Sequence, residues 1–71
     1  INPDSYAQPR ARFHAYLVRA ASKFTLARIS GDARMLDSAR SDVRSARALD
    51  SAKPDAEFFS PMFRAFYRDS K

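Results

Sequence analysis

His14 is the only histidine in the chain, so it is the first side chain to consider as a general base or a metal ligand. Catalysis by a histidine usually requires a second group that orients the ring, and the neighbouring Phe13 and Ala15 offer no carboxylate. A zinc site would need further histidines or cysteines, and the chain has no cysteine. We therefore expect His14 to be a solvated or half-buried structural side chain.

The carboxylates do not group into a site for acid–base chemistry or metal binding. Their positions are expected helix ends and helix surfaces, where capping and ion pairing account for them, and no calcium-loop spacing of alternating acids occurs. They are Asp4, Asp32, Asp37, Asp42, Asp50, Asp55, Glu57 and Asp69. With a single glycine, the chain also lacks a nucleophile elbow and a glycine-rich phosphate loop. We expect no enzymatic activity, no cofactor, no metal and no small-molecule substrate.

Basic helix faces are the remaining source of chemistry. Two groups of side chains each lie along one side of an expected helix, at spacings that bring them together. They are Arg40, Arg44 and Arg47 on one helix, and Arg12, Arg19 and Lys23 on another. Either group could contact phosphates along a nucleic acid, but no Asn, Gln or Lys cluster suited to reading bases accompanies them. An arginine-rich face that is simply solvated is the plain alternative.

The first long helix that must position these groups is predicted over residues 9–30. An irregular lead-in, residues 1–9, precedes it, and Pro9 suits the first helical position because its missing N–H costs nothing there. One apolar arc contains Phe13, Tyr16, Leu17, Ala20, Phe24 and Ala27. Gly31, the only glycine, suits a left-handed cap that ends this helix, and Asp32 can cap the next.

A second helix is predicted over residues 33–50 and a short third one over residues 61–68. The buried face of the second is expected to consist of Met35, Leu36, Ala39, Val43 and Ala46. A loop over residues 51–55 follows, and the pair Ser60-Pro61 repeats the signal for a helix start. Met62, Phe63, Phe66 and Tyr67 form one apolar face of the third helix, and its aromatic side chains are expected to close the groove between the other two.

Two apolar features exceed what this small core requires. Val18, Leu26 and Ile29 fall outside the main arc of the first helix, which indicates contact on a second side or contact with a partner. Five aromatic residues between positions 58 and 67 exceed what one face of a two-turn helix can bury. Exposed aromatic side chains, and through them a partner or dimer contact, are therefore expected on the third helix.

Size and composition point to one small all-α domain. A chain of 71 residues has a marginal core, and without cysteine it cannot be reinforced by disulfide bonds. No apolar run reaches the ~20 residues of a membrane-spanning helix, and no strand pattern occurs. The predicted fold is a helical hairpin of two long antiparallel helices with a short third aromatic helix. The net charge of +5 favours an acidic partner.

The two long helices resemble a single tetratricopeptide-type helix pair. Laid on that family's pattern without gaps, Leu26-Ala27 takes the place of the Leu-Gly pair. The family's spacing then leads to Ala39, Val43 and Ala46, and the ending Ala48-Leu49-Asp50 is typical of how such repeats close. The resemblance covers about thirty residues, or one repeat unit, and implies a role in protein–protein binding through the helix faces.

The chain departs from that pattern at several positions. Lys23 stands where the family has Trp, Ser30 where it has Tyr, and Ser51 where it has Pro. Gly31 also ends the first helix earlier than the family would. An unrelated helical hairpin with a third helix remains the alternative.

The sequence favours a non-enzymatic interaction or assembly module. Its expected partner is another protein or a second copy of itself, bound through an aromatic and arginine-rich surface. That surface is expected to comprise Phe59, Phe63, Phe66, Tyr67, Arg40, Arg44 and Arg47. The alternative is a basic helical domain that binds nucleic acid.

Overall fold

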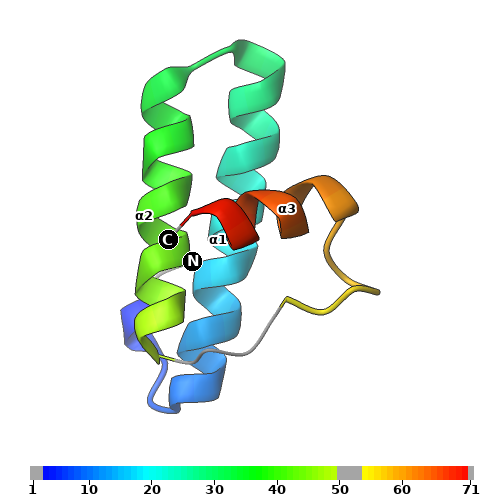
Figure 1. The fold of residues 1–71 in the computed structure, drawn as a ribbon. Coiled ribbons are helices and arrows are strands. Elements are labelled where there is room, and N and C mark those ends of the chain that lie inside the picture. Colours follow the sequence, from blue (N-terminus) through cyan, green and yellow to red (C-terminus); the bar gives the residue numbers. More distant parts are fainter. Residues whose placement is uncertain (1–2, 50–53, 71) are drawn as a thin grey trace.

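Two long antiparallel helices with a short helix across them form the whole of the described fold. The computed structural model describes residues 3–49 and 54–70. Helices α1 (Pro9–Ser30) and α2 (Ala33–Leu49) form a hairpin, and α3 (Pro61–Asp69) crosses its face (Figure 1). A single 3-10 turn, η1 (Pro3–Ser5), precedes α1 within the expected irregular lead-in. The described ranges contain no strand, and the predicted all-α hairpin with a third helix is confirmed.

The hairpin turn follows from two capping residues. Gly31 has a φ of 72° and a ψ of 20°, a left-handed conformation that ends α1, and its N–H donates to the Ala27 carbonyl at 2.7 Å. The Asp32 carboxylate then accepts from the Arg34 N–H at 2.9 Å and so caps α2. These two residues correctly predicted where α1 ends and where α2 begins.

Local capping also determines where α3 begins and ends. The Ser60 hydroxyl accepts from the Phe63 N–H at 3.2 Å, and Pro61 occupies the first helical position. The helix continues to Asp69, one residue beyond the predicted end, and the Ser70 N–H donates to the Phe66 carbonyl at 3.0 Å. The predicted end of α2 at Asp50 and most of the loop after it, residues 51–53, lie outside the described residues.

The core lies where α3 crosses the hairpin. Small residues on α2 leave room for the large rings that α3 and the segment before it contribute. The central buried set is Leu17, Ala20, Val43, Ala46, Phe59, Phe63 and Tyr67. Phe13, Tyr16 and Phe24 pack against it from the predicted arc of α1. Met62 is an exception to the predicted apolar face of α3, because it lies on the exposed side of that helix.

Candidate interaction surface

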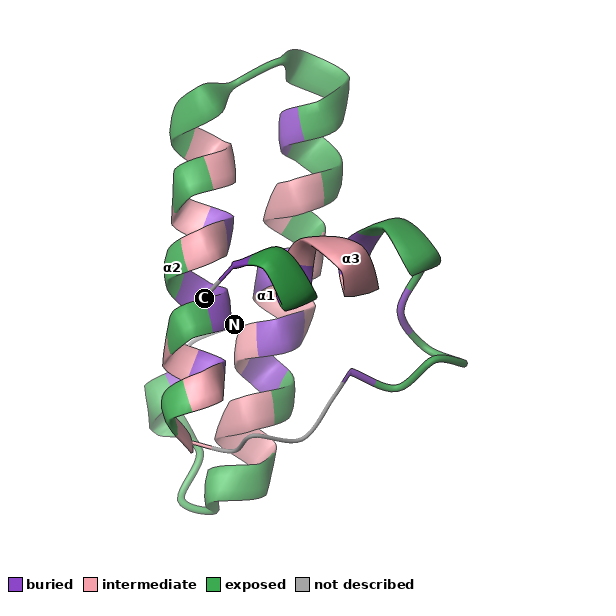
Figure 2. Ribbon diagram, viewed as in Figure 1, coloured by how far each residue is buried: buried purple, intermediate pink, exposed green. Residues whose placement is uncertain are grey.

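The aromatic side chains predicted to contact a partner belong largely to the core. Phe59, Phe63 and Tyr67 are each at most 5% exposed, and Phe66 is half-buried with its ring centroid 4.7 Å from that of Phe24. The structure therefore corrects the expectation that these rings form an exposed surface. They are covered because α3 lies across both long helices, so that its apolar face meets α1 and α2 together (Figure 2).

Two of the three predicted arginines on α2 hold α3 in place. The Arg47 guanidinium donates to the Tyr67 carbonyl at 2.7 Å and lies 4.4 Å from the centroid of the Tyr67 ring. The Arg40 guanidinium lies 5.7 Å from the Phe66 ring and is paired with Asp37 at 3.1 Å. Of the three, only Arg44 is exposed, and it makes no hydrogen bond, ion pair or ring contact with the described residues.

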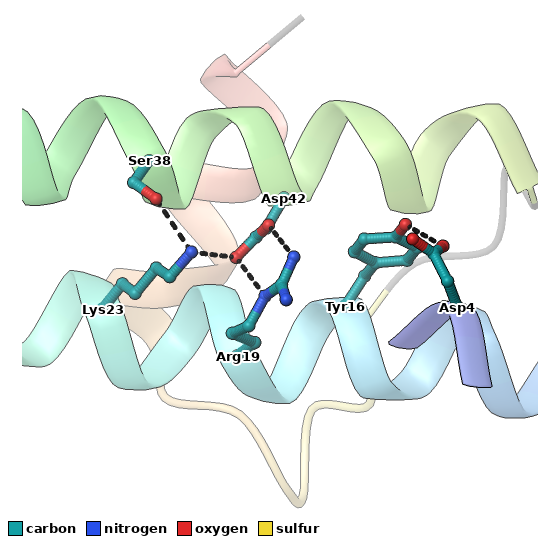
Figure 3. A network of polar contacts seen from close by, with 6 residues as sticks. All are labelled: Asp4, Tyr16, Arg19, Lys23, Ser38 and Asp42. Carbon is teal, nitrogen blue, oxygen red and sulfur yellow. Dashed lines mark hydrogen bonds and ion pairs between the residues drawn. The ribbon is translucent and has the colours of Figure 1, made fainter. Parts of the chain in front are cut away.

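The second basic group meets a buried carboxylate on α2. The Asp42 carboxylate accepts two hydrogen bonds from Arg19, at 2.8 and 3.0 Å, and pairs with Lys23 at 2.9 Å (Figure 3). Burial raises the pKa of the Asp42 carboxyl, but the hydrogen bonds from Arg19 and Lys23 lower it by more, so it lies below its ordinary value. Hydrogen bonding to Asp42 raises the pKa of Arg19. This group binds α1 to α2.

The polar network continues at its two ends. Lys23 also donates to the Ser38 hydroxyl at 2.8 Å, and the Tyr16 hydroxyl donates to the Asp4 carboxylate at 2.6 Å (Figure 3). The bond to Asp4 raises the pKa of Tyr16 and ties η1 to α1. Sequence reasoning placed Asp42 on a helix surface. A helical projection would have indicated it, because Asp42 falls within about 20° of Met35, at the edge of the predicted apolar arc.

The four most exposed large apolar side chains lie on α1, on the segment before α3 and on α3 itself. Leu26 is 52% exposed, Ile29 79%, Phe58 62% and Met62 53%. We call these four residues the apolar patch. They come from the last turns of α1, from the segment before α3 and from the first turn of α3, all largely exposed (Figure 2). Leu26 and Ile29 belong to the apolar residues that fell outside the main arc in the sequence.

The patch borders a continuous outer strip along α1. The strip comprises the residues Ala11, Ala15, Val18, Ser22, Thr25 and Ile29, which follow each other at alternating spacings of four and three. Shallow grooves run beside it, lined at one end by Tyr6 and His14, in the middle by Phe58, and at the other end by Met62. The strip lies on the side of α1 opposite the main arc, but it is only partly exposed, because Ala15 is buried and Val18 packs against the core.

The polar atoms of the outer strip are already satisfied within the helix. The hydroxyl of Ser22 donates to the Val18 carbonyl at 3.0 Å, and that of Thr25 donates to the Ala21 carbonyl at 3.0 Å. Their remaining surface is mainly hydrocarbon. Covering the strip would therefore leave no hydroxyl donor unpaired.

His14, the only histidine of the sequence, is exposed and lies beside this surface. Its ring centroid is 5.4 Å from that of Phe58 and 6.2 Å from that of Phe59. Within residues 3–49 and 54–70, no three His, Cys, Asp or Glu side chains are grouped so that they could hold a metal ion. The histidine is part of the aromatic packing.

Comparisons with protein-family models, with curated proteins and with solved structures found no match to this chain. Of the helices in the described ranges, none combines the length and the apolar character needed to cross a membrane.

Proposed function

We propose that this protein is a non-enzymatic interaction or assembly module, which binds another protein or a second copy of itself. The observation that carries the proposal is the apolar patch, whose four side chains are each more than half exposed beside a core that is already complete. Small folded domains rarely expose large apolar side chains together unless a partner covers them. An arginine at the edge of the patch, Arg28, would give such a contact its polar rim.

We propose an apolar surface bordered by an arginine, and its members differ from those predicted from the sequence. Phe58, Met62 and Arg28 take the place of the buried rings and of the arginines that hold α3. The resemblance to a tetratricopeptide-type helix pair is compatible with this role. The antiparallel packing of α1 and α2 fits it, although any close-packed helical hairpin would have the same arrangement.

Nucleic-acid binding is the weaker alternative. Arg19 and Lys23 are paired with Asp42, while Arg40 and Arg47 contact α3, so most of the two predicted basic groups are engaged within the chain. Arg44 is the exposed residue of the α2 group that takes part in neither of these contacts. Binding to duplex DNA that weakens steeply with added salt and is lost in Arg44→Glu would favour this alternative.

The proposal is tested by comparing a variant of the patch with a matched control. Ile29→Glu places a charge in the patch at a position so exposed that the fold should tolerate it, and Ser41→Glu adds the same charge on the exposed face of α2. Tagged chains are used to capture proteins from extracts of the source cells, and light scattering gives the mass of each purified chain. We expect Ile29→Glu to lose a captured protein, or an oligomeric state, that wild type and Ser41→Glu retain.

A single pattern of results would refute the proposal. If wild type, Ile29→Glu and Ser41→Glu all remain monomeric and capture the same proteins in the same amounts, the apolar patch has no role in binding. Circular dichroism of the three chains provides the control that each one is folded.

A further inference from the structure

We propose that Met62 is a site of reversible oxidation that controls binding through the apolar patch. A peroxide converts its thioether to a sulfoxide, so that a polar group takes the place of an apolar one at the same position. This inference rests on the proposed function and specifies how the same surface is regulated. Its evidence is the exposure of Met62, the contact between its sulfur and Arg28, and its position outside the core.

Met62 is the more accessible of the two methionines of the chain. It is 53% exposed, whereas Met35 on α2 is mostly covered. Met62 lies at the edge of an open hollow between α1 and α3. The other residues that line this hollow are Phe24, Thr25, Arg28, Ile29 and Ser60. A small oxidant in solution therefore reaches the sulfur of Met62 more easily than that of Met35.

The reaction needs only a peroxide and this sulfur. A lone pair of the Met62 sulfur attacks one oxygen of hydrogen peroxide, and the S–O bond forms as the O–O bond breaks. The second oxygen leaves as hydroxide with the electron pair of the broken bond, and it takes the proton of the transferred oxygen to give water. The sulfur is oxidised by two electrons, the peroxide is reduced to water, and the product is methionine sulfoxide.

A hydrogen-bond donor already lies against this sulfur. The Arg28 guanidinium contacts the Met62 sulfur and lies 5.8 Å from the centroid of the Phe24 ring, and it pairs with no carboxylate among the described residues. A thioether sulfur is a weak acceptor, whereas the oxygen of a sulfoxide carries a partial negative charge and accepts a charge-assisted hydrogen bond from a guanidinium. Oxidation of Met62 therefore engages Arg28 and strengthens this contact between α1 and α3.

The sulfoxide changes the binding surface in two ways, and both weaken an apolar contact. Met62 and Ile29 line the same hollow, so a polar group appears beside the most exposed side chain of the apolar patch. A partner that covers the hollow must then remove water from the sulfoxide oxygen. In addition, Arg28 donates to that oxygen and is less available to the carboxylates of a partner.

The fold tolerates the change because Met62 lies outside the core. The rings that α3 buries are those of Phe63 and Tyr67, and Met62 does not belong to the cluster in which they pack. The cap of α3 joins the Ser60 hydroxyl to the Phe63 N–H and does not involve the side chain of Met62. Oxidation of a buried methionine disrupts a core. At Met62 it should alter binding and leave the chain folded.

The first experiment determines which sulfur is oxidised. The purified chain is treated with dilute hydrogen peroxide, and proteolytic digestion with mass spectrometry gives the extent of oxidation at Met62 and at Met35 over time. We expect Met62 to be oxidised several-fold faster than Met35. The helical circular dichroism signal should be unchanged when Met62 alone is modified. In urea, where the chain is unfolded, the two rates should become equal, because the fold causes the difference.

The second experiment uses two variants that imitate the two states of Met62. Met62→Leu keeps the side chain apolar and removes the sulfur, whereas Met62→Gln places a polar oxygen at this position. The light scattering and the capture experiment of the proposed function are repeated with each chain before and after peroxide. Oxidised wild type and Met62→Gln should lose the captured protein or oligomeric state that Ile29→Glu loses. Met62→Leu should keep it after peroxide, and methionine sulfoxide reductases should restore binding by oxidised wild type.

The outcomes separate this inference from the proposed function. Equal oxidation of Met62 and Met35 in the folded chain, or unfolding of the chain when Met62 is modified, would overturn the inference. If Ile29→Glu loses binding but oxidised wild type and Met62→Gln keep it, the proposed function stands and control by oxidation is excluded. If Ile29→Glu binds like wild type, the proposed function fails, and its control by Met62 fails with it.

Discussion

Asp42→Asn should destabilise the folded chain by about 2–3 kcal/mol. The substitution keeps the shape of the side chain but turns one carboxylate oxygen into an NH2 group. That group would face the guanidinium of Arg19 and the ammonium of Lys23, both of which can only donate. The single replacement therefore removes two ion pairs between α1 and α2 and leaves two cations side by side.

The magnitude follows from how far each partner is exposed. Breaking a fully buried ion pair costs about 3–5 kcal/mol, whereas an exposed pair contributes about 0–1 kcal/mol. Here the Asp42 side chain is only 6% exposed, but those of Arg19 and Lys23 are 34% and 28% exposed, so water can solvate the cations once the carboxylate is gone. The expected loss lies between the two limits and is a large part of the roughly 4–10 kcal/mol typical of a chain of this length.

Acid should have the same effect on the wild-type chain. Since the pKa of Asp42 is lower in the folded than in the unfolded chain, its carboxylate stabilises the fold at pH values above about 4. That contribution is lost as the pH falls through the folded pKa. Asp42→Asn should therefore lack this part of the acid dependence and resemble wild type most closely at low pH.

The assay is thermal and urea unfolding, followed by the helical circular dichroism signal, at neutral pH and along an acid series. A loss of 2–3 kcal/mol should lower the melting temperature by roughly 10–20 °C. Asp37→Asn is the matched control, because Asp37 pairs with Arg40 in an exposed position and its replacement should cost at most about 0.5 kcal/mol. If both variants unfold like wild type at neutral pH, the Asp42 network does not stabilise the fold as argued.

Two further substitutions test the core and the hairpin turn by the same unfolding assay. Phe63→Ala should lower the free energy of unfolding by about 3–5 kcal/mol, because the ring is fully enclosed. Phe58→Ala should lower it by no more than about 1 kcal/mol, because its ring is mostly exposed. Equal losses would contradict the assignment of Phe63 to the core. Gly31→Ala should lower the free energy of unfolding by about 1 kcal/mol from its left-handed conformation alone, since no atom beyond its chain neighbours lies within 4 Å of an added methyl group. An unchanged stability would show that the turn adopts another conformation.

The helix boundaries could be predicted from the sequence because local residues determine them. A proline at the first position, a glycine in the left-handed region and a serine cap act within a few residues of themselves. The apolar arc of α1 was equally readable, since a helix repeats its faces at a fixed period. These features depend on no contact between distant parts of the chain.

The exposure of the aromatic side chains could not be predicted in the same way. Whether Phe63 or Met62 is covered depends on the direction in which α3 crosses the hairpin, and that direction is set by packing against both long helices. Counting aromatic residues correctly indicated more apolar surface than the core needs. It assigned the excess to Phe59, Phe63 and Tyr67, whereas Phe58 and Met62 are the exposed members.

Contacts between elements also explain the misplaced basic groups. Arg40 and Arg47 were spaced as a free basic face, but their partners Phe66 and Tyr67 lie on another helix, about twenty or more positions along the chain. The pairing of Arg19 and Lys23 with Asp42 had a signal in the sequence, because Asp42 projects to the edge of the apolar arc of α2. A charge on a buried face predicts a buried partner of opposite sign.

Packing explains two of the arginines of this chain, Arg40 and Arg47. The face of α2 toward the core is made of Ala39, Val43 and Ala46, which are too small to cover the rings of α3 on their own. The long stems and planar groups of Arg40 and Arg47 extend that face and enclose Phe66 and Tyr67. Net charge is then a poor guide to the kind of partner. The positions of the arginines that form no ion pair among the described residues are a better guide. Since Arg28 borders the apolar patch and Arg44 does not, loss of binding in Arg28→Glu but not in Arg44→Glu would indicate a contact that depends on the patch rather than on overall charge.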